Sequence, residues 1–435
     1  MKEKHLVVVS VDAMVFEDLE YARTLPAFSR LLNEGSLIER VKTIYPSLTH
    51  PVHATIMSGC PAGVTGVVCN EVFEPFNEVK RWYNYLDEVH CDTIYHAAKR
   101  AGLTTAAISW PVTSCGQEYI DYLVPCALTA DFYGLEDRPL DAYRKLGAQE
   151  FLMDIIADAV DKYTWANAHP EVDNFMIHCA CEVIKRYKPN LLMTHPSLVD
   201  STRHRTGIFS DAVKDAVKET DKWLGMLMDA LTEAGIYETT DFIVVSDHGQ
   251  LNINRRISPN VFLADKGYIK VDEDGKLLSY DAFIQSAGLS AQVYLSRPDD
   301  KKLYDEIYKL LSEMAEEGIY GFERVFTVDE VKETYGLSGD FSFVLESDGF
   351  TSISEEWVRP VVRTFDIEDY RFGHATHGHM PEKGPQPPFL AAGPSIKKGV
   401  TIPTGSIYNH APTFAKILGV ELKDAWGKAV DEILK

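Results

Sequence analysis

Acidic and histidine side chains stand together at several points of the chain, beside runs of apolar residues. The stretch VVSDHGQ, residues 244–250, ends a run of β-forming residues with Asp247 and His248. Burying such groups at a strand end is unfavourable unless something compensates for their lost hydration, and a metal ion would do so. Asp12 and Asp200 also close apolar runs. One such aspartate is usually a cap or turn former, but three with histidines nearby indicate a metal site.

Further candidate ligands follow at short spacings. VDSTRH places His204 four residues after Asp200, and HATHGH contains His374, His377 and His379 in a glycine-rich loop. Carboxylate oxygens and imidazole nitrogens suit Zn²⁺ or a similar divalent ion, and Mn²⁺ would also accept them. The acids, their histidines and one late histidine are enough for two ions. Two ions can clamp the attacking and leaving oxygens of a displacement at phosphorus.

Thr49 is the candidate nucleophile. It lies in YPSLTHPVHATIMSG, residues 45–59, in a proline-bracketed turn that leads into a run of small residues compatible with a helix. A free hydroxyl is a poor nucleophile, but a metal ion lowers its pKa. His53, at the start of that helix, is expected to be structural.

The alternation of patterns along the chain predicts an α/β fold that could position these groups. Runs rich in β-branched residues predict strands, and apolar residues at helical spacing predict helices. The strands are expected at 5–13, 104–111, 190–200, 241–249 and 387–396, and the helices at 93–102, 211–235 and 411–420. Such an order is typical of a mostly parallel sheet flanked by helices, which binds ligands beyond the carboxyl ends of its strands.

Residues 251–349 have a different pattern. They combine a hairpin-like DEDGK turn with an amphipathic helix in PDDKKLYDEIYKLLSEMAEEG. This mixture predicts a small α+β insertion that caps the site, so that residues 1–250 and 350–435 form the catalytic core. A chain of 435 residues is long enough for one large domain with such an insertion.

Composition narrows the classes of function. The 65 acidic and 43 basic residues give a net charge of −22, which argues against a basic surface for polymeric nucleic acid. A small phosphorylated substrate is not excluded, because a bound cation reverses the local field. No stretch reaches 18 consecutive apolar residues, so we expect no membrane span. The sequence does not indicate an oligomeric state.

A cytoplasmic location is expected. The apolar run in MKEKHLVVVSVDA is too short for a signal peptide and better suits a first buried strand. Seven cysteines, an odd number, are typical of free thiols in a reducing compartment. Cys179 and Cys181 form a weak metal motif, and core packing is the favoured interpretation.

Taken in order, these motifs resemble those of the alkaline phosphatase superfamily, most closely its nucleotide pyrophosphatase/phosphodiesterase branch. Asp12 follows the first strand, and the segment around Thr49 stands where the family has its nucleophile loop. DSTRH matches the family's Asp-x-x-x-His motif, and SDHG is almost identical to the corresponding motif of the family. THG precedes FLAAGP, as in the family. The resemblance implies an alkaline-phosphatase-like core and two metal ions, with Zn²⁺ the usual metal of the family.

The resemblance also assigns the ligands. One ion would be held by Asp200, His204 and His377. The other would be held by Asp12, Asp247, His248 and the Thr49 oxygen. Thr49 would attack phosphorus in line and form a phosphothreonine intermediate, which a hydroxide on the opposite side would hydrolyse. His379 would then be a neighbour of the ligands or a surface residue.

One departure from the family affects substrate binding. The family pattern implies an asparagine three residues after the nucleophile, bonded to a non-bridging phosphate oxygen, and this chain has Val52 there. Loss of such a donor costs about 2.7–4 kcal/mol of transition-state stabilisation when nothing replaces it. Arg203, His50 and His374 are the candidate replacements, with Arg203 and His374 taken as substrate-binding residues.

Several functions stay open. A hydrolase of phosphodiesters or nucleotide-type pyrophosphates is the leading hypothesis, and a phosphonate hydrolase or phosphomonoesterase with the same metals is the alternative. A third hypothesis is an inactive metal-binding module, although the complete ligand set argues against it. A sulfatase is disfavoured because THPVH, residues 49–53, lacks the required arginine. Aromatic clusters at 81–85 and 131–134 could form a wall for the leaving group.

Overall fold

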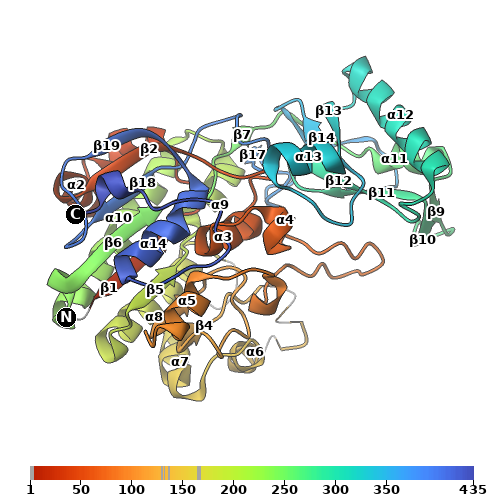
Figure 1. Ribbon diagram of the computed structural model, residues 1–435. Helices are drawn as coiled ribbons and strands as arrows, with labels where there is room; N and C mark the ends of the chain where they lie inside the picture. The colour runs from red at the N-terminus through yellow and green to blue at the C-terminus, as the bar shows by residue number, and fades with distance from the viewer. Residues whose placement is uncertain (1–3, 129–130, 132, 136–137, 164–167) are drawn as a thin grey trace.

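An eight-stranded sheet crosses the larger part of the molecule (Figure 1). The computed structural model describes residues 4–128, 131, 133–135, 138–163 and 168–435, so that Phe132 of one aromatic cluster lies outside the described residues. The strand order is β19-β2-β18-β6-β1-β5-β3-β4. The strands are β1 (His5–Ser10), β2 (Ser36–Lys42), β3 (Thr105–Ile108), β4 (Tyr122–Val124), β5 (Leu191–Thr194), β6 (Thr240–Val245), β18 (Phe389–Ala392) and β19 (Thr401–Ser406).

The sheet is mostly parallel, as the sequence predicted. β1 pairs in parallel with β5 and β6, and β3 pairs in parallel with β4 and β5. β18, expected as one more strand of the set, runs antiparallel to both β2 and β6. β1 is buried along its whole length because Leu6 and Val8 face one layer of the core while Val7 and Val9 face the other. A strand covered on both faces is expected to be apolar throughout.

Helices cover both faces of this sheet. On one face lie α2 (Pro26–Glu34), α6 (Pro139–Lys145), α7 (Met153–Lys162), α8 (Glu171–Tyr187) and α10 (Asp211–Glu233). On the other lie α3 (Thr49–Ser58), α5 (Ile94–Arg100) and α14 (His410–Leu418). Short helices α1 (Leu19–Ala22), α4 (Ala62–Thr65) and α9 (Leu198–Thr206) complete the larger body. α5, α10 and α14 begin and end within two residues of the helices predicted from the sequence.

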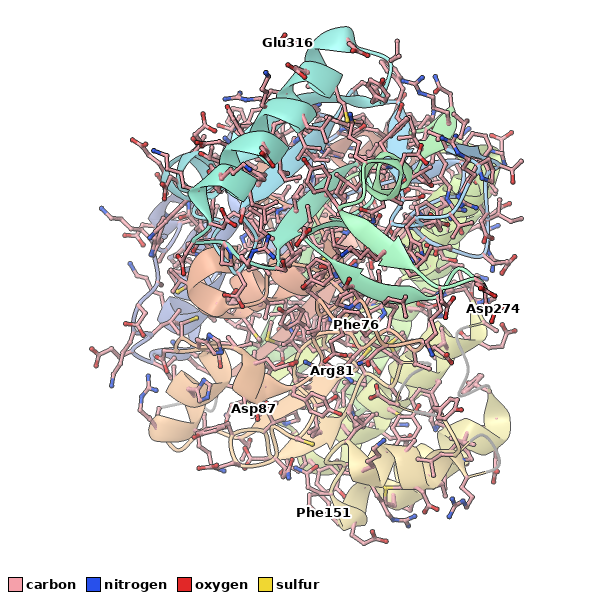
Figure 2. All side chains as sticks on the ribbon, turned by 90° about the vertical axis from the view of Figure 1, so that its right-hand side faces the viewer. Phe76, Arg81, Asp87, Phe151, Asp274 and Glu316 are labelled. Carbon is pink, nitrogen blue, oxygen red and sulfur yellow. The ribbon has the colours of Figure 1, made fainter. Side chains whose placement is uncertain are left out.

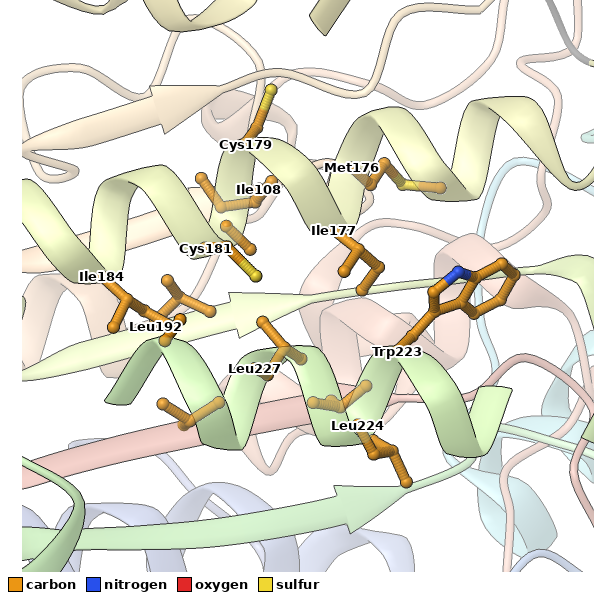
Figure 3. Close-up of a cluster of buried hydrophobic side chains, with 14 of the residues drawn as sticks. Ile108, Met176, Ile177, Cys179, Cys181, Ile184, Leu192, Trp223, Leu224 and Leu227 are labelled. Atoms are coloured by element: carbon orange, nitrogen blue, oxygen red, sulfur yellow. The ribbon is translucent and has the colours of Figure 1, made fainter. Parts of the chain in front are cut away.

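The two closely spaced cysteines belong to the apolar core. Figure 3 shows both on α8, with Cys181 directed toward α10 and Cys179 directed away from it, and both belong to the apolar cluster on this face of the sheet. Both are buried, and the Cys181 thiol donates to the carbonyl of Met226 at 3.6 Å. All seven cysteines are free. These thiols therefore contribute packing rather than metal ligands.

Residues 251–349 form smaller sheets at one end of the molecule, far from both termini (Figure 1). Four antiparallel strands in the order β11-β12-β14-β13 make the largest of them, and α12 packs on it through Leu303, Ile307 and Leu311. The elements are β7 (Leu251–Asn252), β8 (Arg255–Ile257), α11 (Asn260–Asp265), β9 (Ile269–Val271), β10 (Leu277–Tyr280), β11 (Ala282–Ser286), β12 (Ser290–Leu295), α12 (Lys301–Glu317), β13 (Phe322–Thr327), α13 (Val328–Tyr335) and β14 (Phe343–Ser347). β9 and β10 pair across the DEDGK turn as a hairpin.

Strands from beyond residue 349 tie this region to the larger body. β8 pairs with β15 (Thr351–Ile353) and β16 (Val362–Arg363), and β7 pairs with β17 (Ala375–Thr376). The loop after α4 also reaches it, since Phe73 stacks on Tyr294 of β12 with ring centroids 3.6 Å apart. Figure 2 shows Phe76 and Arg81 of that loop between Glu316 of α12, at one end of the molecule in this view, and Phe151, at the other end.

In the described part of the chain, no helix combines the length and the apolar composition that crossing a membrane requires.

Candidate active site

The acidic residues meet where the loops after β1, β5 and β6 converge. Asp12 and Asp247 each follow the last residue of their strand by two positions, as predicted. Asp200 differs from the prediction, because β5 ends at Thr194 and Asp200 lies in the first turn of α9. His204 comes one helical turn later, so both side chains lie on one face of the helix.

Asp247 and Asp12 each use one carboxylate oxygen for positioning and leave the other free. Oδ1 of Asp247 accepts from the backbone N–H groups of Ala13 and His248, at 3.0 and 2.9 Å. Oδ2 of Asp12 lies 3.0 Å from Nε2 of His195. The remaining oxygens, Oδ2 of Asp247 and Oδ1 of Asp12, are buried and have no hydrogen-bond partner. Both point toward the Nε2 atom of His248, at 3.2 and 3.7 Å.

Asp200 and two histidines form a second group. The Asp200 Oδ1 atom accepts from Nε2 of Gln250 at 2.5 Å and lies 3.8 Å from Nε2 of His377. Its Oδ2 atom lies 3.0 Å from Nε2 of His204, but that nitrogen makes no hydrogen bond. Nδ1–H of His204 donates to the Ala375 carbonyl at 2.7 Å, which leaves a lone pair on Nε2 for a metal.

These separations fit two divalent cations. Ligands held about 2.0–2.1 Å from a tetrahedral ion lie about 3.3 Å apart. The Thr49 oxygen lies 3.2 Å from Nε2 of His248, which completes a group with Asp12 and Asp247. Thr49 and His248 are hydrogen-bonded, whereas the nearby oxygens of Asp12 and Asp247 and Nε2 of His204 lack partners, as expected of atoms that face a cation. The structure therefore brings all seven predicted metal ligands close together. Asp200, His204 and His377 form a group as predicted, but Asp12 and His248 group with Asp200. Asp247 and Thr49, predicted to share an ion with Asp12 and His248, each lie 3.2 Å from Nε2 of His248.

Burial disfavours the charged form of the aspartates in this cluster, although at Asp200 the neighbouring His204 and His377 outweigh it and lower the pKa. Burial and the neighbouring carboxylates of Asp200 and Asp247 raise the pKa of Asp12 well above its ordinary value. Burial also raises the pKa of Asp247, to about 6. Burial lowers the pKa of His248 to about 3 and that of His377 well below its usual range, so both imidazoles are neutral near pH 7. Neutral imidazole is the form that binds metal.

A third group of possible ligands, His53, His195 and Asp247, does not fit a metal ion. Nδ1–H of His53 donates to the Thr49 carbonyl at 2.7 Å, and its Nε2 lies 2.9 Å from the hydroxyl of Ser10. Both ring nitrogens are thus occupied. His53 instead fixes the first turn of α3, in agreement with the structural role expected for it.

Thr49 opens onto a cavity of about 450 Å³ at this edge of the sheet. It is the first residue of α3, whose N-terminal dipole favours an anion. An aromatic wall stands beside it, where His50 meets the Trp82 ring at 5.0 Å and Trp82 meets Tyr370 at 5.4 Å. Trp82 comes from the aromatic cluster at 81–85.

Two residues of the site escaped the sequence analysis. His195 follows β5 directly and holds Asp12, and the cue for it was its place at a strand end. Asn70 is buried and lines the cavity, and its Oδ1 atom accepts from the backbone N–H of His50 at 2.9 Å. Asn70 closes the apolar run GVVC, a weak cue of the same kind. Val52 packs into the core, so its position has no access to substrate.

Arg203 and His374, the predicted substrate-binding residues, do not line the cavity. The buried Arg203 guanidinium is paired with Asp18 at 2.5 Å and donates to the carbonyl of Ala13. The sequence placed it near Asp200 but could not reveal that it points the other way. His374 is exposed, with its ring 5.5 Å from Phe365. His379 is buried beside the ligands, and its Nδ1 bonds to the Met380 carbonyl.

The sequence of this chain matches the family model for type I phosphodiesterase / nucleotide pyrophosphatase over residues 6–379. The chain belongs to this phosphodiesterase family. Human ectonucleotide pyrophosphatase/phosphodiesterase family member 1 is 25% identical over 271 residues, which cover 58% of this chain and 24% of that protein. Human family member 5 is 22% identical over 281 residues, covering 62% and 50%. The matched regions are thus only a quarter to a half of these relatives.

Solved structures of the family share the fold. Murine ectonucleotide pyrophosphatase/phosphodiesterase 5 superposes with a TM-score of 0.68 and 19% identity, over 99% of this chain and 100% of that chain. An inactive threonine-to-alanine variant of the same murine protein, in complex with AMP, gives a TM-score of 0.69 at 19% identity, over the full length of both chains. These comparisons show that the family's alkaline-phosphatase-like fold is present here.

We predict that metal removal destabilises the protein because it leaves three buried carboxylates facing one another. Chelation should lower the melting temperature, and elemental analysis should find two metal equivalents per chain before treatment. Asp200→Asn should remove about one equivalent. Asp274→Asn, on the exposed β9–β10 turn (Figure 2), is the control and should retain both. Unchanged metal content in Asp200→Asn would contradict the assignment.

Proposed function

We propose that this family member is a two-metal phosphodiesterase that uses Thr49 as its nucleophile, with Zn²⁺ as the metal. The observation that carries the proposal is the position of the Thr49 hydroxyl. It lies 3.2 Å from Nε2 of His248, close to the free carboxylate oxygen of Asp247, and Thr49 lines the cavity. Phosphodiesters and nucleotide-type pyrophosphates are the proposed substrates, and the acidic surface is unsuited to polymeric nucleic acid.

The reaction would proceed in two displacements. The Thr49 oxygen forms a bond to phosphorus and loses its proton, while the bond from phosphorus to the leaving oxygen breaks. The leaving group departs as an alcohol from a diester and as a phosphate from a pyrophosphate. Water then attacks the phosphothreonine from the opposite side and restores the hydroxyl. Two divalent ions in this site would lower the pKa of attacking groups and neutralise charge on the phosphoryl oxygens. The chain holds Thr49 at the first position of α3, on the wall of the cavity.

Asn70 is the proposed donor to a non-bridging phosphate oxygen. Its Oδ1 atom is occupied by the backbone N–H of His50, which fixes the amide and leaves Nδ2–H₂ available at the cavity wall. In this position Asn70 supplies the interaction that Val52 cannot make. With Asn70 as the donor, the loss of transition-state stabilisation expected from Val52 would not occur.

The relatives support these assignments. In the murine protein 5 a threonine-to-alanine variant is inactive and its complex holds AMP. A nucleoside monophosphate is what a nucleotide pyrophosphatase would release, and the aromatic wall of His50, Trp82 and Tyr370 offers rings on which a base could stack.

Residues 251–349 are proposed to act as a cap on the catalytic core formed by 1–250 and 350–435. Their own apolar cluster, which includes Phe283, Ile307 and Phe343, supports a separate subdomain. β8 of this region also pairs with β15 and β16, which joins the proposed cap to the segment that follows it. The cytoplasmic location stays a prediction, which fractionation of expressing cells would check.

We predict that Thr49→Ala abolishes hydrolysis because Thr49 supplies the attacking oxygen. kcat for bis(p-nitrophenyl) phosphate should fall by at least about 10³-fold. Thr49→Ser, which keeps a hydroxyl, should retain measurable activity. p-Nitrophenyl phosphate serves as the comparison substrate, and a preference for it over the diester would identify a phosphomonoesterase. Undiminished activity in Thr49→Ala would refute the mechanism.

Asn70→Asp should lower kcat/KM for the same diester by about 10²–10³-fold, since the new carboxylate still accepts from His50 but cannot donate to phosphate. Its melting temperature should stay close to that of the wild type. Val52→Ala is the contrasting variant: it should lower the free energy of unfolding by about 1–3 kcal/mol while kcat stays nearly unchanged. Equal effects of the two variants on kcat would count against a role for Asn70.

A further inference from the structure

A histidine–aspartate pair stands in another wall of the cavity, away from the metal ligands. Nδ1–H of His169 donates to Oδ2 of Asp173 at 2.6 Å. Asp173 belongs to α8 and is fully buried, and its Oδ1 atom accepts the backbone N–H of Ser197 at 2.7 Å. Ser197 lies in the loop that leads to Asp200. The orientation of the His169 ring is therefore fixed relative to the metal cluster.

The outer nitrogen of His169 is free to bind a ligand. The ring lines the same cavity as Thr49, and none of the residues that the structure describes accepts a hydrogen bond from Nε2. Burial lowers the pKa of His169, but the hydrogen bond and charge of Asp173 outweigh this and hold the pKa above its ordinary value. A protonated ring presents Nε2–H as a charge-assisted donor, which is stronger than a neutral one.

The other cations of the cavity wall are already neutralised by neighbours on the wall itself. Arg371 pairs with Asp369 at 2.9 Å and with Glu71 at 3.3 Å. Arg205 pairs with Glu368 at 3.1 Å. Asp173, the acid that neutralises the charge of His169, is fully buried on the far side of the ring from the cavity. Only the Nε2–H donor of His169 therefore faces the cavity.

We infer that His169 recognises an anionic oxygen on an organic substituent of the phosphodiester, carried by a carboxylate or a second phosphoryl group. The inference rests on the proposed phosphodiesterase function and adds a substrate class to it. A diester has two organic arms, and one of them would extend along the wall formed by His169, Val172 and Phe175. His169 would bind that arm, whereas Thr49 and the metals act on phosphorus.

Two matched diesters test this assignment. Both carry p-nitrophenol as the leaving group, and the second arm is either 3-carboxypropyl or its neutral isostere, 3-carbamoylpropyl. The metal-loaded wild type should prefer the carboxylate by about tenfold in kcat/KM. His169→Gln keeps a donor to Asp173 and should reduce that ratio to about one. Asp173→Asn, which removes the charge behind the ring, should reduce it as well.

His178→Gln is the matched control. His178 lies on α8, as Asp173 does, and is paired with an aspartate, Asp158, at 2.7 Å, but it does not line the cavity. This variant should keep the wild-type ratio. A wild-type ratio near one, or an unchanged ratio in His169→Gln, would overturn the inference. A loss in His169→Gln that affects both diesters equally would mean that the residue is only structural.

Bis(p-nitrophenyl) phosphate, assayed in parallel, separates this inference from the proposed function. If the wild type does not cleave it, the phosphodiesterase proposal fails. Calorimetric titration of the Thr49→Ala protein with 3-carboxypropyl and 3-carbamoylpropyl phosphate then still measures the preference. About tenfold tighter binding of the carboxylate, lost in the double variant with His169→Gln, would support recognition by His169, and equal affinities would refute it.

Discussion

Three aspartates buried at one edge of the sheet are the constraint on which the site depends. Two carboxylates 4 Å apart repel by about 4 kcal/mol at an effective dielectric constant near 20. Asp12, Asp200 and Asp247 are gathered with His248 and His377, imidazoles that burial keeps neutral. Burial disfavours the charged forms of Asp12 and Asp247, and divalent cations would offset that charge. The fold brings the acids together because parallel strands end at the same edge.

The free oxygens are aimed by bonds to the other atom of each carboxylate. Backbone N–H groups hold Asp247, a glutamine holds Asp200, and His195 holds Asp12. The same logic fixes His204 through the Ala375 carbonyl and Asn70 through the N–H of His50. In each of these carboxylate, imidazole and amide groups, one polar atom is held by a hydrogen bond and the other is the atom proposed to bind a metal or the substrate. Such anchoring keeps the geometry of a site when charges in it are mutually repulsive.

The sequence predicted the parts of this site that obey local rules. Asp12 and Asp247 end apolar strands, and the i, i+4 spacing of Asp200 and His204 is meaningful wherever it falls on a helix. The sequence could not predict the direction of a side chain. Arg203, one position before His204, points to Asp18. Contacts between distant segments were also beyond it, as with Asn70, which lies on a loop with no periodic pattern. The reversed strand β18 escaped because apolar composition does not encode strand direction.

Buried charges elsewhere in the chain show how the metal cluster differs from ordinary structure. Arg203 is neutralised by Asp18, and Arg371 by Asp369 and Glu71, in each case by partners that the chain itself supplies. A buried pair of this kind is complete and needs no ligand. The pair of His169 and Asp173 is intermediate, because its charge is balanced while one donor stays open to the cavity. In the metal cluster one carboxylate oxygen each of Asp12 and Asp247, and Nε2 of His204, are buried without a hydrogen-bond partner. The number of polar atoms without a partner thus distinguishes three kinds of buried group. The structural ion pairs have none, the proposed substrate contact His169 has one, and the proposed reaction centre has several.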